Sequence, residues 1–235
     1  MSEPIAIGLP SKGRLKEAAL EVFEKAGLAI DLPSDPRSYR GTVSSHGYID
    51  VVFLSASEIA RDVAAGRVHL GVTGLDLAHE NIPDFADKIA FEAPLGFGFA
   101  DVIVGVPEAW FDVESMDDLG AVAGQFRALY GRPMKVATKY VNITNRHFRQ
   151  HGIDLYRIIE SLGATEAAPA AGSADIIVDI TTTGSTMRAN HLKQIVDGTM
   201  LESQATLMRS KTVTASDQQS SLIAQVVDAL ARATG

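Results

Sequence analysis

Cysteine is absent from this chain of 235 residues, which excludes disulfides, thiolate metal sites and cysteine nucleophiles together. Long apolar runs are absent too, since no stretch approaches the roughly 20 residues that cross a bilayer. The first ten residues carry an acid at Glu3 and no basic region, so we expect no signal peptide. These absences predict a cytoplasmic protein without a membrane partner.

The chain also lacks net positive charge and the common nucleotide-binding motifs. Its formal net charge of −8 disfavours a nucleic-acid partner. The pattern G-x-x-x-x-G-K-[ST] does not occur, which excludes a P-loop NTPase. Gly8 and Gly13 do not have the spacing of a G-x-G-x-x-G fingerprint, which disfavours a nicotinamide-dinucleotide site. A polyanionic ligand would therefore depend on local cations, backbone N–H groups or Mg²⁺.

Strand-like and helix-like patterns alternate along the chain, which predicts an α/β protein with a mainly parallel sheet. We expect buried strands at residues 5–9, 50–54, 68–73, 102–106, 135–137 and 176–179. Helices are expected near residues 15–26, from Ser55 to Gly66, briefly after Gly74, and near 115–130, 143–162 and 217–233. Gly27 has the position of a helix C′ residue, and Ser115 with Asp118 predicts a capping box.

A weak internal repeat suggests two α/β lobes. The segments 64–74 and 170–184 each place a small-residue turn before a buried strand and a Thr-Gly loop, although parallel α/β proteins repeat such units anyway. The glycine-rich stretch 93–100 predicts a crossover, and the stretch between Lys193 and Lys211 predicts the return. We therefore expect one lobe of residues 1–98 plus 197–235 and a second of residues 99–196, with a ligand cleft between them.

A hydroxyl-rich loop follows the expected strand at residues 176–179. After Asp179 and Ile180 come Thr181, Thr182, Thr183, Gly184, Ser185 and Thr186. Hydroxyls and free N–H groups just before a helix can cradle a phosphate, and an acid at the strand end can accept ribose hydroxyls. The alternative is ordinary turn and cap chemistry. The number of hydroxyls favours a phosphoribosyl site.

Three further segments follow strands. Lys12, Gly13 and Arg14 open the first expected helix, where two cations flank a glycine and suit phosphates, although a basic surface turn is an alternative. Asp76 follows Gly74 and would either lie near an adenine or serve as a favourable charge at a helix start. Lys139 follows the strand at 135–137.

The six histidines do not predict a metal centre. His147 and His151 have helical i, i+4 spacing, but no acid accompanies them in H-E-x-x-H form, so a solvated helix face is expected. Any metal is expected to be Mg²⁺ carried by substrate phosphates, which needs few protein ligands.

The chain resembles the ATP phosphoribosyltransferases, which catalyse the first step of histidine biosynthesis. The resemblance rests on a long pattern with fixed spacing: Glu166, five residues, Gly172, Ala174, Ile177, Asp179, Thr183, Gly184, Thr186 and Met187. It extends to K-G-R-L at 12–15, V-H-L-G-V-T-G-L-D at 68–76 and A-T-K-Y at 137–140. Leu15, Gly74 and Glu166 join the expected substrate-binding residues on this ground.

The resemblance implies two α/β lobes like a type II periplasmic binding protein. The family's long form has an additional C-terminal domain, whereas this sequence ends at Gly235 after one expected helix, so we expect the short form. That form works with a histidyl-tRNA-synthetase-like regulatory subunit, and we also expect a homodimer. One departure is Ala100-Asp101, where family members often carry Cys-Arg. An acidic side chain repels a phosphate, so this departure counts against a phosphate contact at that position.

The implied reaction is attack by N1 of ATP on C1 of phosphoribosyl pyrophosphate, with release of pyrophosphate. The loop would hold the 5-phosphate, Asp179 the ribose hydroxyls, and Lys12, Arg14 and Lys139 the remaining phosphates. Asp179, Lys12 and Arg14 are the expected catalytic residues. Two alternatives remain from the residues alone: a non-catalytic solute receptor, and a phosphoribosyltransferase for another base.

Overall fold

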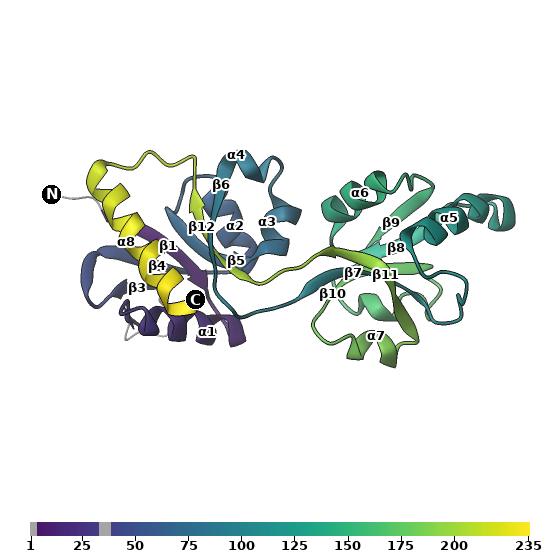
Figure 1. The fold of residues 1–235 in the computed structure, drawn as a ribbon, viewed down its shortest axis with the longest axis horizontal. Helices are drawn as coiled ribbons and strands as arrows, with labels where there is room; N and C mark the ends of the chain where they lie inside the picture. Colours follow the sequence, from purple (N-terminus) through teal and green to yellow (C-terminus); the bar gives the residue numbers. More distant parts are fainter. Residues whose placement is uncertain (1–3, 33–38) are drawn as a thin grey trace. The chain divides into compact units, whose positions relative to one another are not determined.

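The chain divides into two compact units, each described here by itself (Figure 1). The computed structural model describes residues 4–32 and 39–235, so that Glu3 lies outside the described residues. Met1–Phe99 with Ser203–Gly235 form the first unit, and Ala100–Glu202 form the second. The return thus falls at Ser203 rather than 197, because β11 (Leu192–Leu201) stays paired with β7 (Asp101–Pro107) as far as Leu201.

Among the described residues, the first unit holds one sheet with the strand order β2-β3-β4-β1-β5-β12-β6. Its strands are β1 (Ile5–Pro10), β2 (Ile30–Asp31), β3 (Arg40–Val43), β4 (His46–Leu54), β5 (Leu70–Gly74), β6 (Ile89–Pro94) and β12 (Ala205–Ser210). β1 runs parallel to β4 and β5, whereas β12 runs antiparallel to β5 and β6. The return segment therefore becomes an interior strand of this sheet.

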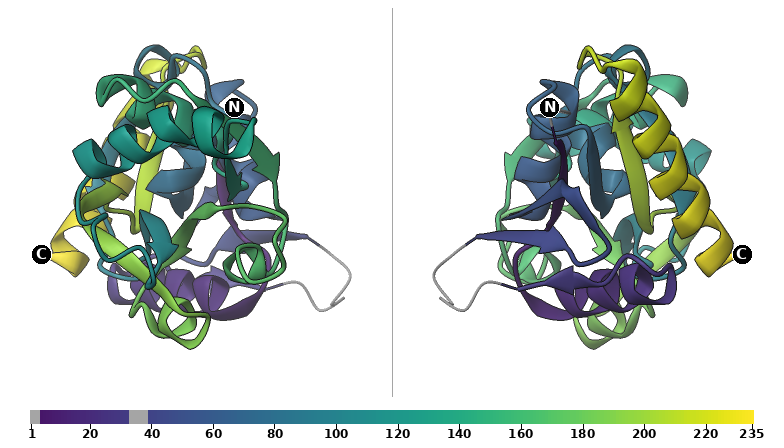
Figure 2. Two further views of the ribbon diagram at one scale, coloured as in Figure 1. Left: turned by 90° about the vertical axis from the view of Figure 1, so that its right-hand side faces the viewer. Right: turned by 90° about the vertical axis from the view of Figure 1, so that its left-hand side faces the viewer.

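The helices of the first unit are α1 (Gly13–Lys25), α2 (Ala56–Ala64), α3 (Leu75–Asn81), α4 (Phe85–Lys88) and α8 (Asp217–Thr234). Apolar side chains of α8, Val226 and Leu230 among them, share one core with Phe23 of α1 and with the sheet. Figures 1 and 2 show α8 lying across a face of that sheet. The helix expected from Ser55 is confirmed as α2, and Ser55 caps its start, because its Oγ accepts from the N–H of Glu58 while Glu58 accepts from Ser55 N–H.

Among its described residues, the second unit holds a sheet with the order β11-β7-β10-β8-β9. It adds β8 (Met134–Thr138), β9 (Tyr156–Glu160) and β10 (Ile176–Thr181) to β7 and β11. The helices are α5 (Met116–Tyr130), α6 (Val141–Gln150) and α7 (Ser185–Ala189), with a 3-10 turn η1 at Thr165–Ala167. The predicted capping box of Ser115 and Asp118 is present at the start of α5.

Two sequence expectations are wrong. The single helix expected near 143–162 ends at Gln150, because Gly152 takes a positive φ of +66° and the chain continues as strand β9. The sheets are mixed rather than mainly parallel, since β10 is parallel to β8 but antiparallel to β7. The α/β class itself is confirmed. Within residues 4–32 and 39–235, no helix has the length and apolar character needed to cross a bilayer.

Candidate active site

The hydroxyl-rich loop forms a compact turn at the end of β10. The strand runs to Thr181, and Gly184 has a φ of +68°, the left-handed region that favours glycine. The N–H of Gly184 donates to Thr181 Oγ1 at 2.9 Å, and Thr183 Oγ1 donates to Ser185 Oγ at 3.0 Å. The hydroxyls therefore hold the turn in shape, and α7 begins directly after it.

A pocket of about 380 Å³ lies against this loop, within the second unit. Its lining joins the loop to η1 and to the start of β7: Ala100, Glu166, Ile177, Asp179, Ile180, Thr181, Thr182, Thr183, Ser185, Thr186 and Met187. The structure thus gathers the hydroxyl residues and two of the three acids that the sequence selected, Glu166 and Asp179. Ala100, one of the two residues that depart from the family pattern, also contributes to the wall.

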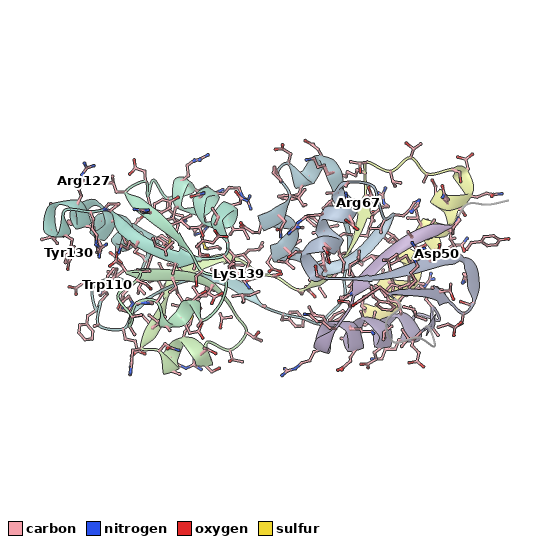
Figure 3. The ribbon with its side chains drawn as sticks, turned by 180° about the vertical axis from the view of Figure 1, so that it is seen from behind. Asp50, Arg67, Trp110, Arg127, Tyr130 and Lys139 are labelled. Carbon is pink, nitrogen blue, oxygen red and sulfur yellow. The ribbon has the colours of Figure 1, made fainter. Side chains whose placement is uncertain are left out.

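Asp179 is a half-buried residue of this lining. Burial is the largest influence on its carboxyl and raises its pKa above the usual range, and the nearby charge of Glu166 raises it further. The Ile180 N–H, which donates to Asp179 Oδ1 at 2.8 Å, and the charge of Lys139 act in the opposite direction. Lys139, at the end of β8 (Figure 3), is thus an electrostatic neighbour of Asp179.

A second pocket, of about 410 Å³, lies on the other side of the same loop. It is lined by Asp101, Glu108, Thr181, Thr182, Thr183, Gly184, Met187, Arg188, Leu192, Lys193 and Gln194. Asp101 pairs with Thr181 across the β7–β10 ladder. The acidic residue that departs from the family pattern therefore lies beside the first residue of the loop.

Arg188 is a residue of this site that sequence reasoning missed. A methyl group on Gly184 would lie 2.9 Å from Arg188 Nη1, so the guanidinium folds back over the loop. Arg188 lies four residues after Gly184, about one helical turn, and this spacing is the signal by which the sequence could have indicated it. Among the described residues its guanidinium has no carboxylate partner within 4.0 Å, which leaves its charge available to a bound anion.

The basic candidates of the first unit lie where β1 ends and α1 begins. Lys12 and Arg14 are exposed, and Gly13 has a φ of +68° with open space around its Cα. Leu15, unlike its exposed neighbours, is partly buried. Its Cδ2 would lie 2.7 Å from a methyl group placed on Gly98. Leu15 therefore packs against the glycine-rich crossover, and its predicted contact with substrate stays a prediction.

Asp76 is held inside the first unit, in the first turn of α3. It is 5 % exposed, its N–H donates to Ser203 Oγ at 3.0 Å, and that hydroxyl donates to Asp76 Oδ1 at 2.8 Å. A methyl group on Gly74 would collide with this carboxylate at 2.3 Å. The position fits the alternative of a charge at a helix start, and a role at the adenine stays a prediction.

The expectation of a solvated histidine pair is wrong for His147. Its Nε2 is buried without a hydrogen-bond partner. Burial, reinforced by His151, lowers the pKa of its ring, and Asp197 partly opposes this. The two rings lie 4.7 Å apart. Among the described residues no three His, Asp or Glu side chains are grouped to hold a metal ion.

Comparison with known proteins identifies the family. The family model described as HisG, ATP phosphoribosyltransferase, matches residues 55–232. The chain belongs to the ATP phosphoribosyltransferase family. An ATP phosphoribosyltransferase of Mesorhizobium japonicum is 54% identical over 98% of this chain and 100% of its own length. One from Brucella suis is 57% identical over 88% of this chain and 90% of its own length. These are transferases of the first step of histidine biosynthesis, so the resemblance found in the sequence is confirmed.

Solved structures agree on the fold. The chain is similar to an ATP phosphoribosyl transferase (HisG:HisZ) complex from Thermotoga maritima, with a TM-score of 0.74 and 20% identity over 98% of this chain and 97% of that one. The extracellular-binding protein of a probable amino-acid ABC transporter from Bacillus subtilis is also similar, with a TM-score of 0.54 and 13% sequence identity. That match covers 99% of this chain and 92% of the other. The expected likeness to periplasmic binding proteins is thereby confirmed as a likeness of fold.

Proposed function

We propose that this chain transfers the 5-phosphoribosyl group of phosphoribosyl pyrophosphate to N1 of ATP and releases pyrophosphate. The observation that carries the proposal is the pocket of about 380 Å³ in which Asp179 and the loop of Thr181 to Thr186 line one wall, in a member of the ATP phosphoribosyltransferase family. A strand-end acid beside a hydroxyl-rich turn suits a sugar that carries a phosphate.

The loop is assigned to the 5-phosphate. Thr182, Thr183 and Ser185 offer hydroxyls, and the N–H groups of Gly184 and Ser185 hold the turn by donating to the hydroxyls of Thr181 and Thr183. Arg188 lines the pocket of about 410 Å³ against the same loop, and its guanidinium lies close to Gly184, so it can supply positive charge to a phosphate that is bound at the loop itself. A dianion in a pocket that contains Asp179 and Glu166 needs such a cation.

Asp179 is assigned to the ribose hydroxyls. Its carboxylate can accept two hydrogen bonds from neighbouring hydroxyls, which fixes the ring and turns C1 toward the acceptor. The same negative charge stabilises the oxocarbenium-like character that develops at C1 as pyrophosphate departs. Because burial raises the pKa of Asp179, hydroxyl donors from the sugar also compensate for the desolvation of its charged form.

The remaining candidates are assigned to the pyrophosphate and the nucleotide. Lys12, Arg14 and Lys139 are exposed cations at strand ends, suited to phosphate oxygens. Gly13 lets the backbone approach a ligand. Gly74 and Asp76 are assigned to the adenine side, with Asp76 acting through the position it gives to the start of α3. Mg²⁺ would enter on the substrate phosphates and neutralise the departing pyrophosphate, which requires few protein ligands.

The proposed assembly contains a homodimer of this chain and a histidyl-tRNA-synthetase-like regulatory subunit. Support comes from the Thermotoga maritima structure, which is described as a HisG:HisZ complex. A cytoplasmic location is proposed because both substrates are intracellular metabolites.

The experiment that tests the function measures pyrophosphate release. The chain is mixed with phosphoribosyl pyrophosphate, Mg²⁺ and either ATP or a free base, with and without the regulatory subunit. Release with ATP and none with adenine, guanine or uracil supports the proposal. Release with a free base, or none with ATP when the regulatory subunit is present, overturns it.

The binding step is tested separately by calorimetry. Phosphoribosyl pyrophosphate should bind the chain, and Arg188→Ala should weaken that binding. Exposed Arg127 on α5 lies outside both loop pockets, so Arg127→Ala serves as the matched control and should bind like the parent. A chain that binds amino acids but not phosphoribosyl pyrophosphate would be a solute receptor instead.

A further inference from the structure

The turn that follows β8 is held by a buried threonine. Thr138, the last residue of the strand, is fully buried, and its Oγ1 accepts from the N–H of Tyr140 at 2.8 Å. The carbonyl of Tyr140 accepts in turn from the N–H and the hydroxyl of Thr144, at 3.0 and 2.6 Å. Lys139 is exposed, but its Nζ lies 5.0 Å from the centroid of the Tyr140 ring, a cation–π contact. The backbone on both sides of Lys139 and its ammonium are therefore restrained.

The sheet register brings Lys139 beside Asp179. β8 and β10 are parallel neighbours in which Ala137 lies opposite Ile177, and two residues further along the same register puts Lys139 level with Asp179. Ala137 and Ile177 share one cluster of buried side chains, whereas Tyr140 belongs to the cluster formed by the alternate residues of the two strands. Because side chains alternate between the faces of a strand, Lys139 and Asp179 extend from the same face.

The carboxyl of Asp179 is surrounded by charges of both signs. Burial is the largest influence on it and raises its pKa, Glu166 of η1 raises the pKa further, and Lys139 lowers it. Asp101 of β7 and Arg188 of α7 line the pocket on the other side of the loop. Among the described residues no carboxylate lies within 4.0 Å of Lys139 Nζ, so its charge acts on Asp179 at longer range.

We propose that Thr138 is a positioning residue for donor recognition: its hydroxyl holds the turn that keeps Lys139 beside Asp179, and Lys139 supplies the positive charge that keeps Asp179 ionised for the sugar hydroxyls. The proposal rests on the function proposed above, which assigns Asp179 to the ribose. It gives Lys139 a task in the empty pocket, before any phosphate arrives. Without the Thr138 hydroxyl the N–H of Tyr140 would lose this partner inside the protein, and the turn would shift to replace it.

The first test follows the Asp179 carboxyl in the chain without substrate. The aspartate carboxyls are labelled with carbon-13, the Asp179 signal is identified with Asp179→Asn, and it is titrated by NMR between about pH 3 and 8. Lys139→Met should raise the midpoint of Asp179, Lys139→Arg should leave it near the parent's, and Glu166→Gln should lower it. Thr138→Val, which removes the acceptor at nearly constant volume, should also raise the midpoint, and Thr138→Ser should not.

Two matched controls separate positioning from general damage. Ser115→Ala removes another hydroxyl that accepts from a backbone N–H of the second unit, that of Asp118 at 3.2 Å. Arg127→Gln removes an exposed positive charge of α5 that lines neither loop pocket (labelled with Lys139 in Figure 3). Neither variant should move the Asp179 midpoint. A purely structural role of Thr138 would lower the melting temperature of Thr138→Val, as Ser115→Ala does, and leave that midpoint in place.

The double variant Thr138→Val/Lys139→Met shows whether the hydroxyl acts through the lysine. If it does, the Asp179 midpoint of the double variant equals that of Lys139→Met alone, because nothing is left for the turn to position. Independent effects would instead add. Lys139 is exposed, so Lys139→Met should fold, and an unchanged midpoint in that variant is sufficient to overturn the proposal even if Thr138→Val does not fold.

The second test measures kcat/KM for phosphoribosyl pyrophosphate against pH, from pyrophosphate release with ATP. Lys139→Met and Thr138→Val should move the acid limb of the profile to higher pH, and Thr138→Ser should keep the parent's profile. The substrate phosphates titrate alike in every variant, so the differences report the protein.

The proposal is overturned if the Asp179 midpoint does not move in Lys139→Met or in folded Thr138→Val, or if the two shifts add in the double variant. An equal loss of kcat/KM at every pH would also overturn it, because Lys139 would then act only as a phosphate contact. A parent chain that releases no pyrophosphate with ATP contradicts the proposed function instead, and the NMR midpoints, which need no substrate, still decide whether Thr138 positions Lys139.

Discussion

Replacement of Gly184 by alanine tests the assignment of the phosphate loop. Gly184 has a φ of +68°, and a methyl group there would lie 2.9 Å from Arg188 Nη1. The left-handed backbone costs an alanine about 1–2 kcal/mol. The arginine is the flexible partner, so we expect it to swing off the loop and withdraw its charge from the phosphate. A lost hydrogen bond to a charged group costs about 1.5–3 kcal/mol, which corresponds to about 10–100-fold in affinity.

The assay is steady-state pyrophosphate release at saturating ATP, together with a thermal melt. Gly184→Ala should raise KM for phosphoribosyl pyrophosphate about 10–100-fold and lower the melting temperature. The matched control is Gly131→Ala at the end of α5, where φ is +67° and nothing lies within 4 Å of the added methyl group. It should lower the melting temperature similarly and leave KM unchanged. A Gly184→Ala enzyme with the parent's KM and the expected loss of melting temperature would refute the reasoning.

Four further outcomes follow from other contacts. Asp179→Asn should lower turnover about 10²–10³-fold yet raise the melting temperature at pH 7, because burial raises the pKa of Asp179. That gain should vanish below about pH 4, where the carboxyl is protonated in both the folded and unfolded states; equal melting temperatures at neutral pH would contradict it. Asp175→Asn removes the negative charge opposite Arg132 and leaves one oxygen where the carboxylate accepts two hydrogen bonds, at 2.6 and 2.8 Å; it should cost about 2–3 kcal/mol in urea unfolding, a value reduced because Arg132 is partly exposed. Burial opposes ionisation of Asp175, but Arg132 and the Lys135 N–H outweigh it and lower its pKa, so this loss should shrink as the pH falls below about 4. Ser203→Ala should destabilise the chain by about 1–3 kcal/mol through its two hydrogen bonds with Asp76; an unchanged urea midpoint would show that they contribute nothing. Chelation by EDTA should stop pyrophosphate release without changing the melting temperature, and a large thermal shift would reveal a structural metal.

Local features of this chain were predictable because their causes are local. The caps at Ser55 and Ser115 involve residues three positions apart, and a glycine that follows a helix is typical of a left-handed backbone. The loop at 181–186 was found for the same reason, since its hydroxyls are consecutive and its acid lies at the end of an apolar run. In the structure they line one pocket.

Features that depend on distant partners were not predictable. The burial of Asp76 rests on Ser203, which lies 127 positions away in the sequence. The antiparallel pairing of β10 with β7 depends on how the chain enters the second unit, and no local pattern records it. The sequence predicts a helix over β9 because Ile158 and Ile159 continue an apolar pattern, and a short apolar run does not distinguish a helix from a strand.

The pairing of Asp101 with Thr181 has a consequence for how such enzymes diverge. Ala100 opens the second unit and lines the pocket at the proposed phosphate loop, and Asp101 is the backbone neighbour of Thr181, so positions 100 and 101 belong to the connection and to the candidate site at once. Substitutions in a connecting segment usually have little effect on function. At positions 100 and 101 we expect them to change the affinity for phosphoribosyl pyrophosphate even when every hydroxyl of the loop is retained. Natural variation at these two positions is therefore where differences in affinity between otherwise matching enzymes should first be sought.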